Sequence, residues 1–432
     1  MRAGFPIDFQ VDPRDPQRIF ANEYGGGNFL SSDGGSSWVV ASSGYTGAQV
    51  RDIAVDSASG RIYAAARSGI FMSEDGGSNW SGLNSPPAYS MEWYVVSIDP
   101  TDSQHILAAN NWNGIILVSR DGGGEWRSVG AHAGETMSWR AIAFAPSDPK
   151  TVYAGTSAYF SAGTFDNRLP AAGIYVSLDG GESWSPSNDG VSQDANVSDL
   201  AVVEDNPQVV YAATGNHGML KSVDGGGSWA AINQGIPGSP EALAVVVHPN
   251  DANILYAGLA FGGLYRSVDG GQTWEASAAG LNPEASISDI LFDLTNPQTI
   301  YAADLFSGVY QSTNGGTDWL PVNVGLRTRA VNKMAFSSDG AHLYAGTEGE
   351  GVFRLDLSGE PPQPIIAPTQ PEPTQTAQIS EAPATVTSQP PAAKPPATPQ
   401  STTAPTGSKL CGGVFALPIA LVGLVALRRS RK

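Results

Sequence analysis

The chain has 432 residues, a formal net charge of −18, 51 glycines and only 15% charged residues. Nucleic-acid binding is disfavoured, because it requires Lys and Arg clustered against phosphate groups. The single cysteine, Cys411, excludes an intrachain disulfide, and five scattered histidines lack the spacing of zinc ligands, so we expect no metal and no cofactor.

Eight similar units are predicted between residues 5 and 357. Each begins with an apolar strand, a Pro/Asp/Asn turn and a second strand, as in Thr151-Val-Tyr-Ala-Gly. A loop, a third strand, a glycine-rich turn and a fourth strand follow. Seven units carry the motif Ser-x-Asp-x-Gly-x-x-Trp in this turn, at residues 31–38, 73–80, 119–126, 177–184, 222–229, 267–274 and 312–319.

The spacing of the motif indicates the architecture. A motif followed by a strand, recurring about every 40–45 residues with four strands per repeat, is typical of the blades of a β-propeller. The eighth unit, residues 332–357, has three predicted strands and no motif. We therefore expect an all-β propeller of eight four-stranded blades with a three-stranded closing blade, and seven blades is the alternative.

Each motif residue has a structural use. Asp and Ser accept hydrogen bonds from turn amides, the glycines allow positive φ, and the Trp buries a large ring at the start of the fourth strand. The last copy has Asn314 at the Asp position. A calcium loop needs several carboxylates at alternating positions, whereas this motif supplies one.

With these motifs, the sequence resembles the Asp-box, or BNR-repeat, family of β-propellers. That family includes sialidases, xyloglucan-active hydrolases, photosystem II assembly factors and sortilin-type receptors. The resemblance covers residues 5–357 and implies the fold rather than an activity. It further implies that the boxes lie away from the ligand face, which would consist of the strand 2–3 loops and the connections between units.

The residues expected on that face combine aromatic rings with charged groups, which suits sugar rings. The candidate ligand-binding residues are Asp52, Trp93, Trp112, Trp139, Arg140, Phe165, Asp166, Arg168, Asp199 and Asp289. Arg51 and Lys333 are expected near the mouth of a central channel, and His217, Phe261 and Phe306 lie in strand 2–3 loops. Residues 157–172 form a long insertion, which is a typical place for function on a regular scaffold.

Catalysis is not indicated. The Arg-Ile-Pro segment that a sialidase resemblance implies is missing, and no acidic residue can be matched to the two carboxylates that a glycoside hydrolase requires. We expect a propeller that binds an extracellular ligand, with carbohydrate as the first guess and protein as the second. The alternatives are a glycoside hydrolase with a carboxylate pair at the channel mouth and an assembly factor that holds a protein partner.

The C-terminal part has a different composition. Residues 358–409 are rich in Pro and Thr, which predicts a disordered, extended stalk. Residues 410–427 are apolar and would span roughly 27 Å as a helix, enough for one membrane crossing. The basic tail, residues 428–432, is expected in the cytoplasm, which places the propeller outside a bacterial membrane.

This C-terminal arrangement also resembles bacterial sorting signals, so processing or lipidation near Cys411 is an alternative to a simple anchor. An exported propeller needs an export signal, and the residues after Met1 do not form one. We therefore expect the true start to lie upstream, or the sequence to be a fragment.

Overall fold

The structure is a computed structural model that describes residues 5–24, 27–37, 39–40, 49–67, 69–83, 93–110, 114–130, 138–160, 168–169, 171–192, 194–238 and 240–357. Every regular element in these ranges is a β-strand, which confirms the predicted all-β class. Within them, we find no helix with the length and hydropathy needed to cross a membrane. The predicted stalk, span and tail lie outside the described residues.

Eight antiparallel sheets contain almost all of the strands, and each follows chain order from its first to its last strand. The first sheet contains β1 (Phe5–Asp12), β2 (Asp15–Tyr24), β3 (Gly27–Ser31) and β4 (Val39–Val40). The second contains β5 (Val50–Val55), β6 (Ile62–Ala66), β7 (Gly69–Ser73) and β8 (Ser81–Gly82). The third contains β9 (Trp93–Asp99), β10 (Asp102–Asn110), β11 (Ile115–Ser119) and β12 (Arg127–Gly130).

The fourth and fifth sheets differ in the loop after their second strand. The fourth contains β13 (Trp139–Ala145), β14 (Asp148–Thr156), β17 (Ile174–Ser177) and β18 (Ser185–Pro186). Its long insertion forms the small pair β15 (Tyr159–Phe160) and β16 (Arg168–Leu169). The fifth contains β19 (Val197–Val203), β20 (Asn206–Thr214), β21 (Gly218–Ser222) and β22 (Ala230–Ala231).

The last three sheets complete the described part of the chain. The sixth contains β23 (Ala242–His248), β24 (Asp251–Leu259), β25 (Gly263–Ser267) and β26 (Glu275–Ala276). The seventh contains β27 (Ile287–Phe292), β28 (Ile300–Asp304), β29 (Gly308–Ser312) and β30 (Leu320–Pro321). The eighth has the three strands β31 (Val331–Phe336), β32 (His342–Thr347) and β33 (Val352–Asp356), as the sequence predicted.

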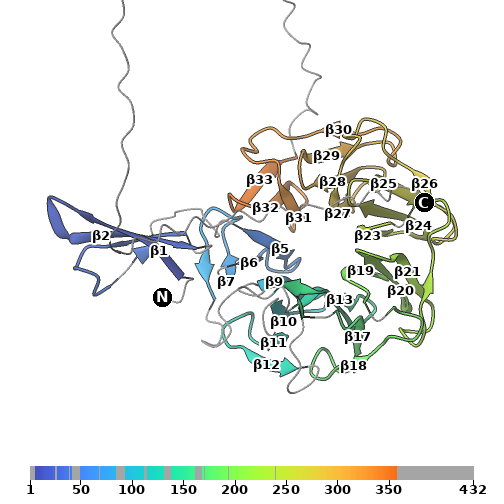
Figure 1. Ribbon diagram of the computed structural model, residues 1–432, viewed down its shortest axis with the longest axis horizontal. Coiled ribbons are helices and arrows are strands. Elements are labelled where there is room, and N and C mark those ends of the chain that lie inside the picture. The colour runs from blue at the N-terminus through green and yellow to red at the C-terminus, as the bar shows by residue number, and fades with distance from the viewer. Residues whose placement is uncertain are drawn as a thin grey trace, which may run out of the picture. The chain divides into compact units, whose positions relative to one another are not determined.

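Seven of the eight sheets form a closed ring (Figure 1). Their first strands pack on one another in the order β5, β9, β13, β19, β23, β27 and β31, and β31 packs back on β5. The number of sheets is therefore the eight that the motif spacing indicated, whereas the ring has seven blades, the alternative number. The first sheet, β1–β4, has a box of its own but is not one of these seven.

A tyrosine in the second strand of several blades holds the next blade. The hydroxyl of Tyr63 donates to the carbonyl oxygen of Gly122 at 3.0 Å, and Tyr211 and Tyr256 donate to the corresponding box carbonyls of Gly270 and Gly315 at 3.2 and 2.7 Å. Since each phenol group is surrounded by packed strands, this hydrogen bond satisfies a buried polar group and fixes the angle between the blades.

At the point where the ring closes, a tyrosine again lies against the box of the next blade. A Cβ atom on Gly76, in the box of the β5–β8 blade, would lie 3.6 Å from the hydroxyl oxygen of Tyr344 in β32. Arg354 in β33 also donates to the carbonyl oxygen of Gly76 at 3.4 Å. The eighth sheet therefore holds the second sheet in the way that neighbouring blades hold each other elsewhere.

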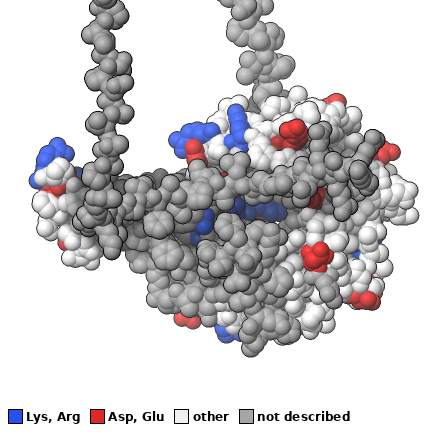
Figure 2. Space-filling view, in the orientation of Figure 1, with Lys and Arg blue, Asp and Glu red and all other residues white. Residues whose placement is uncertain are grey.

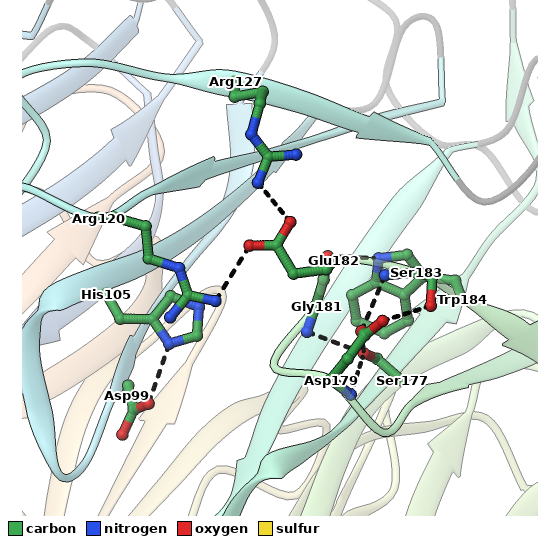
Figure 3. A network of polar contacts seen from close by, with 10 residues as sticks. All are labelled: Asp99, His105, Arg120, Arg127, Ser177, Asp179, Gly181, Glu182, Ser183 and Trp184. Atoms are coloured by element: carbon green, nitrogen blue, oxygen red, sulfur yellow. Dashed lines mark hydrogen bonds and ion pairs between the residues drawn. The ribbon is translucent and has the colours of Figure 1, made fainter.

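The seam between the β9–β12 and β13–β18 blades differs (Figure 3). Leu107 takes the place of the tyrosine, and its side chain lies against Gly181 in the box of the next blade. Glu182 in that box instead accepts hydrogen bonds from Arg120, at 3.1 Å, and from Arg127. Although partial burial opposes it, the hydrogen bonds from Arg127 and Arg120 hold the pKa of Glu182 below its usual value. Charged groups therefore replace the tyrosine hydroxyl at this seam.

The boxes are turns closed by their own side chains, as predicted. In the box of residues 222–229, Asp224 accepts from the hydroxyl of Ser222 at 2.8 Å and from the amide of Ser228 at 2.8 Å. The hydroxyl of Ser228 also donates to Asp224, and this hydrogen bond is the largest of those that lower the pKa of Asp224 to about 2. The indole of Trp229 donates to the hydroxyl of Ser187 in the preceding blade at 3.1 Å, so the box also ties two blades together.

The departure at Asn314 leaves the turn intact. The side-chain oxygen of Asn314 accepts from the hydroxyl of Ser312 at 2.9 Å and from the amide of Asp318 at 3.0 Å, in place of the usual carboxylate. Its side-chain nitrogen donates to the carboxylate of Asp318 at 3.1 Å. In this box the carboxylate belongs to Asp318, four residues after the usual position, and the hydrogen bonds of the turn are retained.

Two glycines with positive φ allow the packing of a box to be tested separately from its backbone. Gly271 has φ +87°, and an added Cβ would lie 2.6 Å from Cδ1 of Ile232 in the preceding blade. Gly325 also has φ +87°, but nothing lies within 4 Å of an added Cβ. Both Ala substitutions carry the left-handed strain of about 1–2 kcal/mol, and Gly271→Ala adds an overpacking cost of about 1–3 kcal/mol.

We expect Gly271→Ala to lower the denaturation midpoint of the full chain clearly more than Gly325→Ala does. Chemical denaturation followed by tryptophan fluorescence measures both midpoints. Equal losses in the two variants would show that the box does not pack tightly on its neighbour.

Candidate functional site

A cavity of ≈ 600 Å³ lies among the first strands of the ring. Each first strand has a β-bulge after its opening residue, so that one residue is skipped in the pairing with the second strand. All seven skipped residues line the cavity, and we call them the bulge ring: Arg51, Tyr94, Arg140, Ser198, Leu243, Ser288 and Asn332. Figure 2 shows basic side chains in the hollow at the centre of the ring.

The bulge ring is cationic and aromatic on three consecutive blades. The guanidinium carbons of Arg51 and Arg140 lie 5.0 and 4.1 Å from the centre of the Tyr94 ring. Arg51 also pairs with Glu348, which accepts from the side chain of Asn332 at 3.0 Å. The other blades contribute short polar side chains and Leu243, with Leu305 also lining the cavity. The wall of the cavity therefore has a cationic side and a side with apolar groups.

The residue after each bulge forms a second layer, in which four positions are charged. Asp52, Asp199 and Asp289 each accept a hydrogen bond from a backbone amide of the next blade, at 3.0, 3.0 and 2.7 Å. These carboxylates therefore join first strands across three seams. Each carboxylate gives a hydrogen-bond partner to a backbone amide that would otherwise be buried without one.

Lys333 supplies the positive charge that offsets the carboxylates of this layer. Its amino nitrogen lies 3.1 Å from Asp289 and 3.5 Å from Asp199, and only 26% of its side chain is exposed. Burial raises the pKa of Asp52 to about 7, despite the opposing charge of Lys333. Burial also raises the pKa of Asp199. For Lys333, burial opposes the charged form, but Asp199 and Asp289 outweigh it and raise its pKa.

The structure places the predicted site residues in three groups. Asp52, Arg140 and Asp199 line the cavity, and Asp289 contacts Lys333 there. Trp93 and Trp139 have no exposed surface and pack in the hydrophobic core, so the expectation that they face a ligand is corrected. The opening residue of each first strand is buried between blades, whereas the bulged residue after it lines the cavity. Trp112, Phe165, Asp166 and the side chain of Arg168 lie outside the described residues.

Tyr94 is a cavity residue that sequence reasoning missed, and so are Leu243 and Leu305. Tyr94 follows Trp93 directly, as Arg51 follows Val50 and Arg140 follows Trp139. Tyr94, Arg51 and Arg140 all occupy the second position of a first strand. This shared position can be recognised in the sequence only when the units are aligned on their bulges. In the described part of the chain, no group of three or more His, Cys, Asp or Glu residues is arranged to hold a metal ion.

Removal of the central cation tests the second layer. Lys333→Met removes the positive charge that lowers the pKa values of Asp52 and Asp199, so these two pKa values rise further above the unfolded values. A raised acid pKa gives stability that is present at low pH and lost as pH rises through the folded pKa. We therefore expect a small loss near pH 4.5 and a loss of about 2–4 kcal/mol at pH 8, after allowance for cavity water.

Urea denaturation of the full chain at both pH values measures this effect, with Lys150→Met as the control because Lys150 is an exposed lysine. A loss in Lys333→Met that is the same at pH 4.5 and pH 8 would contradict the assigned role.

Two family models match the chain. The model described as sortilin, neurotensin receptor 3, matches residues 68–220, and the model of the photosynthesis system II assembly factor YCF48 matches residues 171–358. No curated protein sequence matches the chain.

Two solved structures show the same fold at low sequence identity, and a third aligns with a lower TM-score. The extracellular domain of the two-component system BT4673 from B. thetaiotaomicron is 13% identical with a TM-score of 0.54, over 71% of this chain and 38% of that one. U3-55K is 15% identical with a TM-score of 0.54, over 72% and 96%. YCF48 from Cyanidioschyzon merolae is 16% identical with a TM-score of 0.43, over 72% and 94%. The seven boxes and the two family-model matches make the chain similar to the Asp-box, or BNR-repeat, family of β-propellers.

Proposed function

We propose that the propeller is a non-catalytic binding module that holds a peptide segment of a protein partner at its central cavity. The observation that carries the proposal is the Tyr94 ring, over which lie the guanidinium groups of both Arg51 and Arg140. Guanidinium groups over an aromatic face are donors held in a fixed orientation, which suits carbonyl and carboxylate groups of a peptide.

The same arrangement argues against carbohydrate, the first guess from sequence. A sugar ring stacks on a free aromatic face, and Tyr94 is contacted by two guanidinium groups. Trp93 and Trp139 are buried in the core and offer no surface for stacking. Leu243 and Leu305 elsewhere on the cavity wall suit the apolar side chains of a peptide.

Hydrolysis is disfavoured by the hydrogen bonding of the acids. A glycoside hydrolase needs one carboxyl group as acid and a second as base or nucleophile. Here Asp52, Asp199 and Asp289 each bind a backbone amide of the next blade, and two of them pair with Lys333. The two matching family models are those of a receptor and of an assembly factor, which is consistent with a binding role.

A random peptide display library on the immobilised full chain tests the binding function. We expect peptides to be enriched, and Arg140→Ala to weaken their binding at least tenfold because it removes one guanidinium from the Tyr94 stack. Arg61→Ala is the matched control, because Arg61 pairs with Glu74 near a box and does not line the cavity. A glycan array and a reducing-sugar assay run in parallel, and glycan binding or turnover without peptide enrichment would overturn the proposal.

We further propose, from the composition of residues 358–432, that the propeller is displayed outside a bacterial membrane on a Pro/Thr-rich stalk. In a bacterial host, the full chain should sediment with the membrane fraction, and deletion of residues 410–432 should move it to the soluble fraction. Immunoblots of the two fractions measure this, and a full chain found only in the soluble fraction would refute the anchor.

A further inference from the structure

Two exposed phenylalanines lie together at neighbouring strand 2–3 loops. Phe261, between β24 and β25, and Phe306, between β28 and β29, are each 58% exposed. Their rings are stacked, with centres 5.7 Å apart and planes 20° apart. The corresponding position in the β20–β21 loop is Asn216, and in the β32–β33 loop it is Gly349. Leaving two large apolar rings in water is unfavourable, so the pair requires an explanation.

The backbone at Phe261 is strained. Its φ of 53° is in the left-handed region, and among the described residues it is the one non-glycine residue there. A bulky side chain in this region is a genuine outlier and persists only where the surroundings enforce it. The amide of Phe261 donates to the hydroxyl of Ser286 at 2.9 Å, which holds this conformation.

A buried relay links the two loops. The amide of Ser286 donates to the carboxylate of Asp304 at 2.9 Å, and the same oxygen of Asp304 accepts from the amide of Phe306 at 3.1 Å. Ser286 is 1% exposed and Asp304 is not exposed at all. The two aromatic side chains are therefore presented by a hydrogen-bonded support that is itself shielded from water, which keeps their mutual orientation fixed.

The backbone that supports the pair continues to the cavity wall. Leu305, next to Phe306, lines the cavity, and its amide donates to the carbonyl oxygen of Ser286 at 3.1 Å. The carbonyl oxygen of Ala285 accepts from the amide of Gly263 at 3.0 Å, so the connection that ends in Ala285 and Ser286 lies between the two loops. Glu284, the residue directly before Ala285, is exposed and belongs to the same connection.

We propose that the Phe261–Phe306 pair is a binding site for a basic side chain, preferentially arginine, of the peptide partner. A guanidinium group stacks on an aromatic face and pairs with a neighbouring carboxylate. Glu284 supplies that carboxylate, and the net charge of −18 attracts basic partners over a longer range. This inference rests on the proposed peptide-binding function and assigns one contact within it.

The display selection on the full chain provides the test. The enriched peptides can be sequenced, and their binding can be measured on variants of the protein. We expect enriched peptides to carry an arginine or lysine, and replacement of that residue by alanine to weaken binding at least tenfold. The double variant Phe261→Leu, Phe306→Leu keeps apolar volume but removes the rings, and should weaken binding by a similar factor. Glu284→Gln should weaken it about threefold and reduce its salt dependence.

Matched controls separate the site from general surface effects. Phe20→Ala removes an exposed phenylalanine of β2, and Glu275→Gln neutralises an exposed carboxylate of β26. Neither should change peptide affinity. Thermal melting of each variant checks folding, and because the substituted side chains are exposed, we expect melting temperatures close to that of the parent chain.

The remaining outcomes are distinguishable. Peptides that need Arg140 but bind the Phe→Leu double variant unchanged would retain the proposed function and overturn this inference. Enriched peptides without a basic residue would overturn it as well. No enriched peptide at all would remove the proposed function and this inference together.

Discussion

The packing of one sheet on the next is the constraint on which the whole molecule depends. A second strand such as β6 is buried at every residue, so both faces of its sheet need cover. In a closed ring each sheet covers its two neighbours, and no blade presents an open face. The hydrogen bonds from tyrosines and box tryptophans to adjacent blades set the angle, and the seam at Leu107 shows that charged side chains can do the same.

The bulges convert this architecture into a site. A regular strand alternates its side chains between two faces, both of which are needed for packing between blades. One skipped residue near the start of each first strand turns a side chain toward the axis without removing any neighbour from the core. The bulge position therefore holds side chains as different as Arg51, Tyr94 and Leu243, because it faces the cavity rather than the apolar packing between blades. The next position is less free, since Asp52 and its counterparts bind across the seam.

Sequence reasoning predicted the fold well and the site incompletely. The period and the boxes predicted four-stranded sheets, because the Ser, Asp and Gly residues of each motif act within their own turn. Three apolar segments without a box predicted the three-stranded last sheet. Motifs cannot indicate which sheets join the ring, since the sheet β1–β4 has a box like the others, and closure depends on the contact of Tyr344 with Gly76. Trp93 and Trp139 were assigned to the ligand face because the bulge, which has no composition of its own, decides which of two adjacent residues faces the cavity.

The closing contact has a consequence for the order in which the chain folds. Arg354 and Gly76, which meet at the last seam, are 278 residues apart in sequence. Bringing such distant segments together costs about 5 kcal/mol of chain entropy, so the seam forms late, after the intervening blades have assembled. During synthesis at about 5–20 residues per second, the free face of the β5–β8 blade waits roughly 15–55 s for its partner. For that interval the nascent ring presents an uncovered apolar face, which makes chaperone binding most useful near this blade.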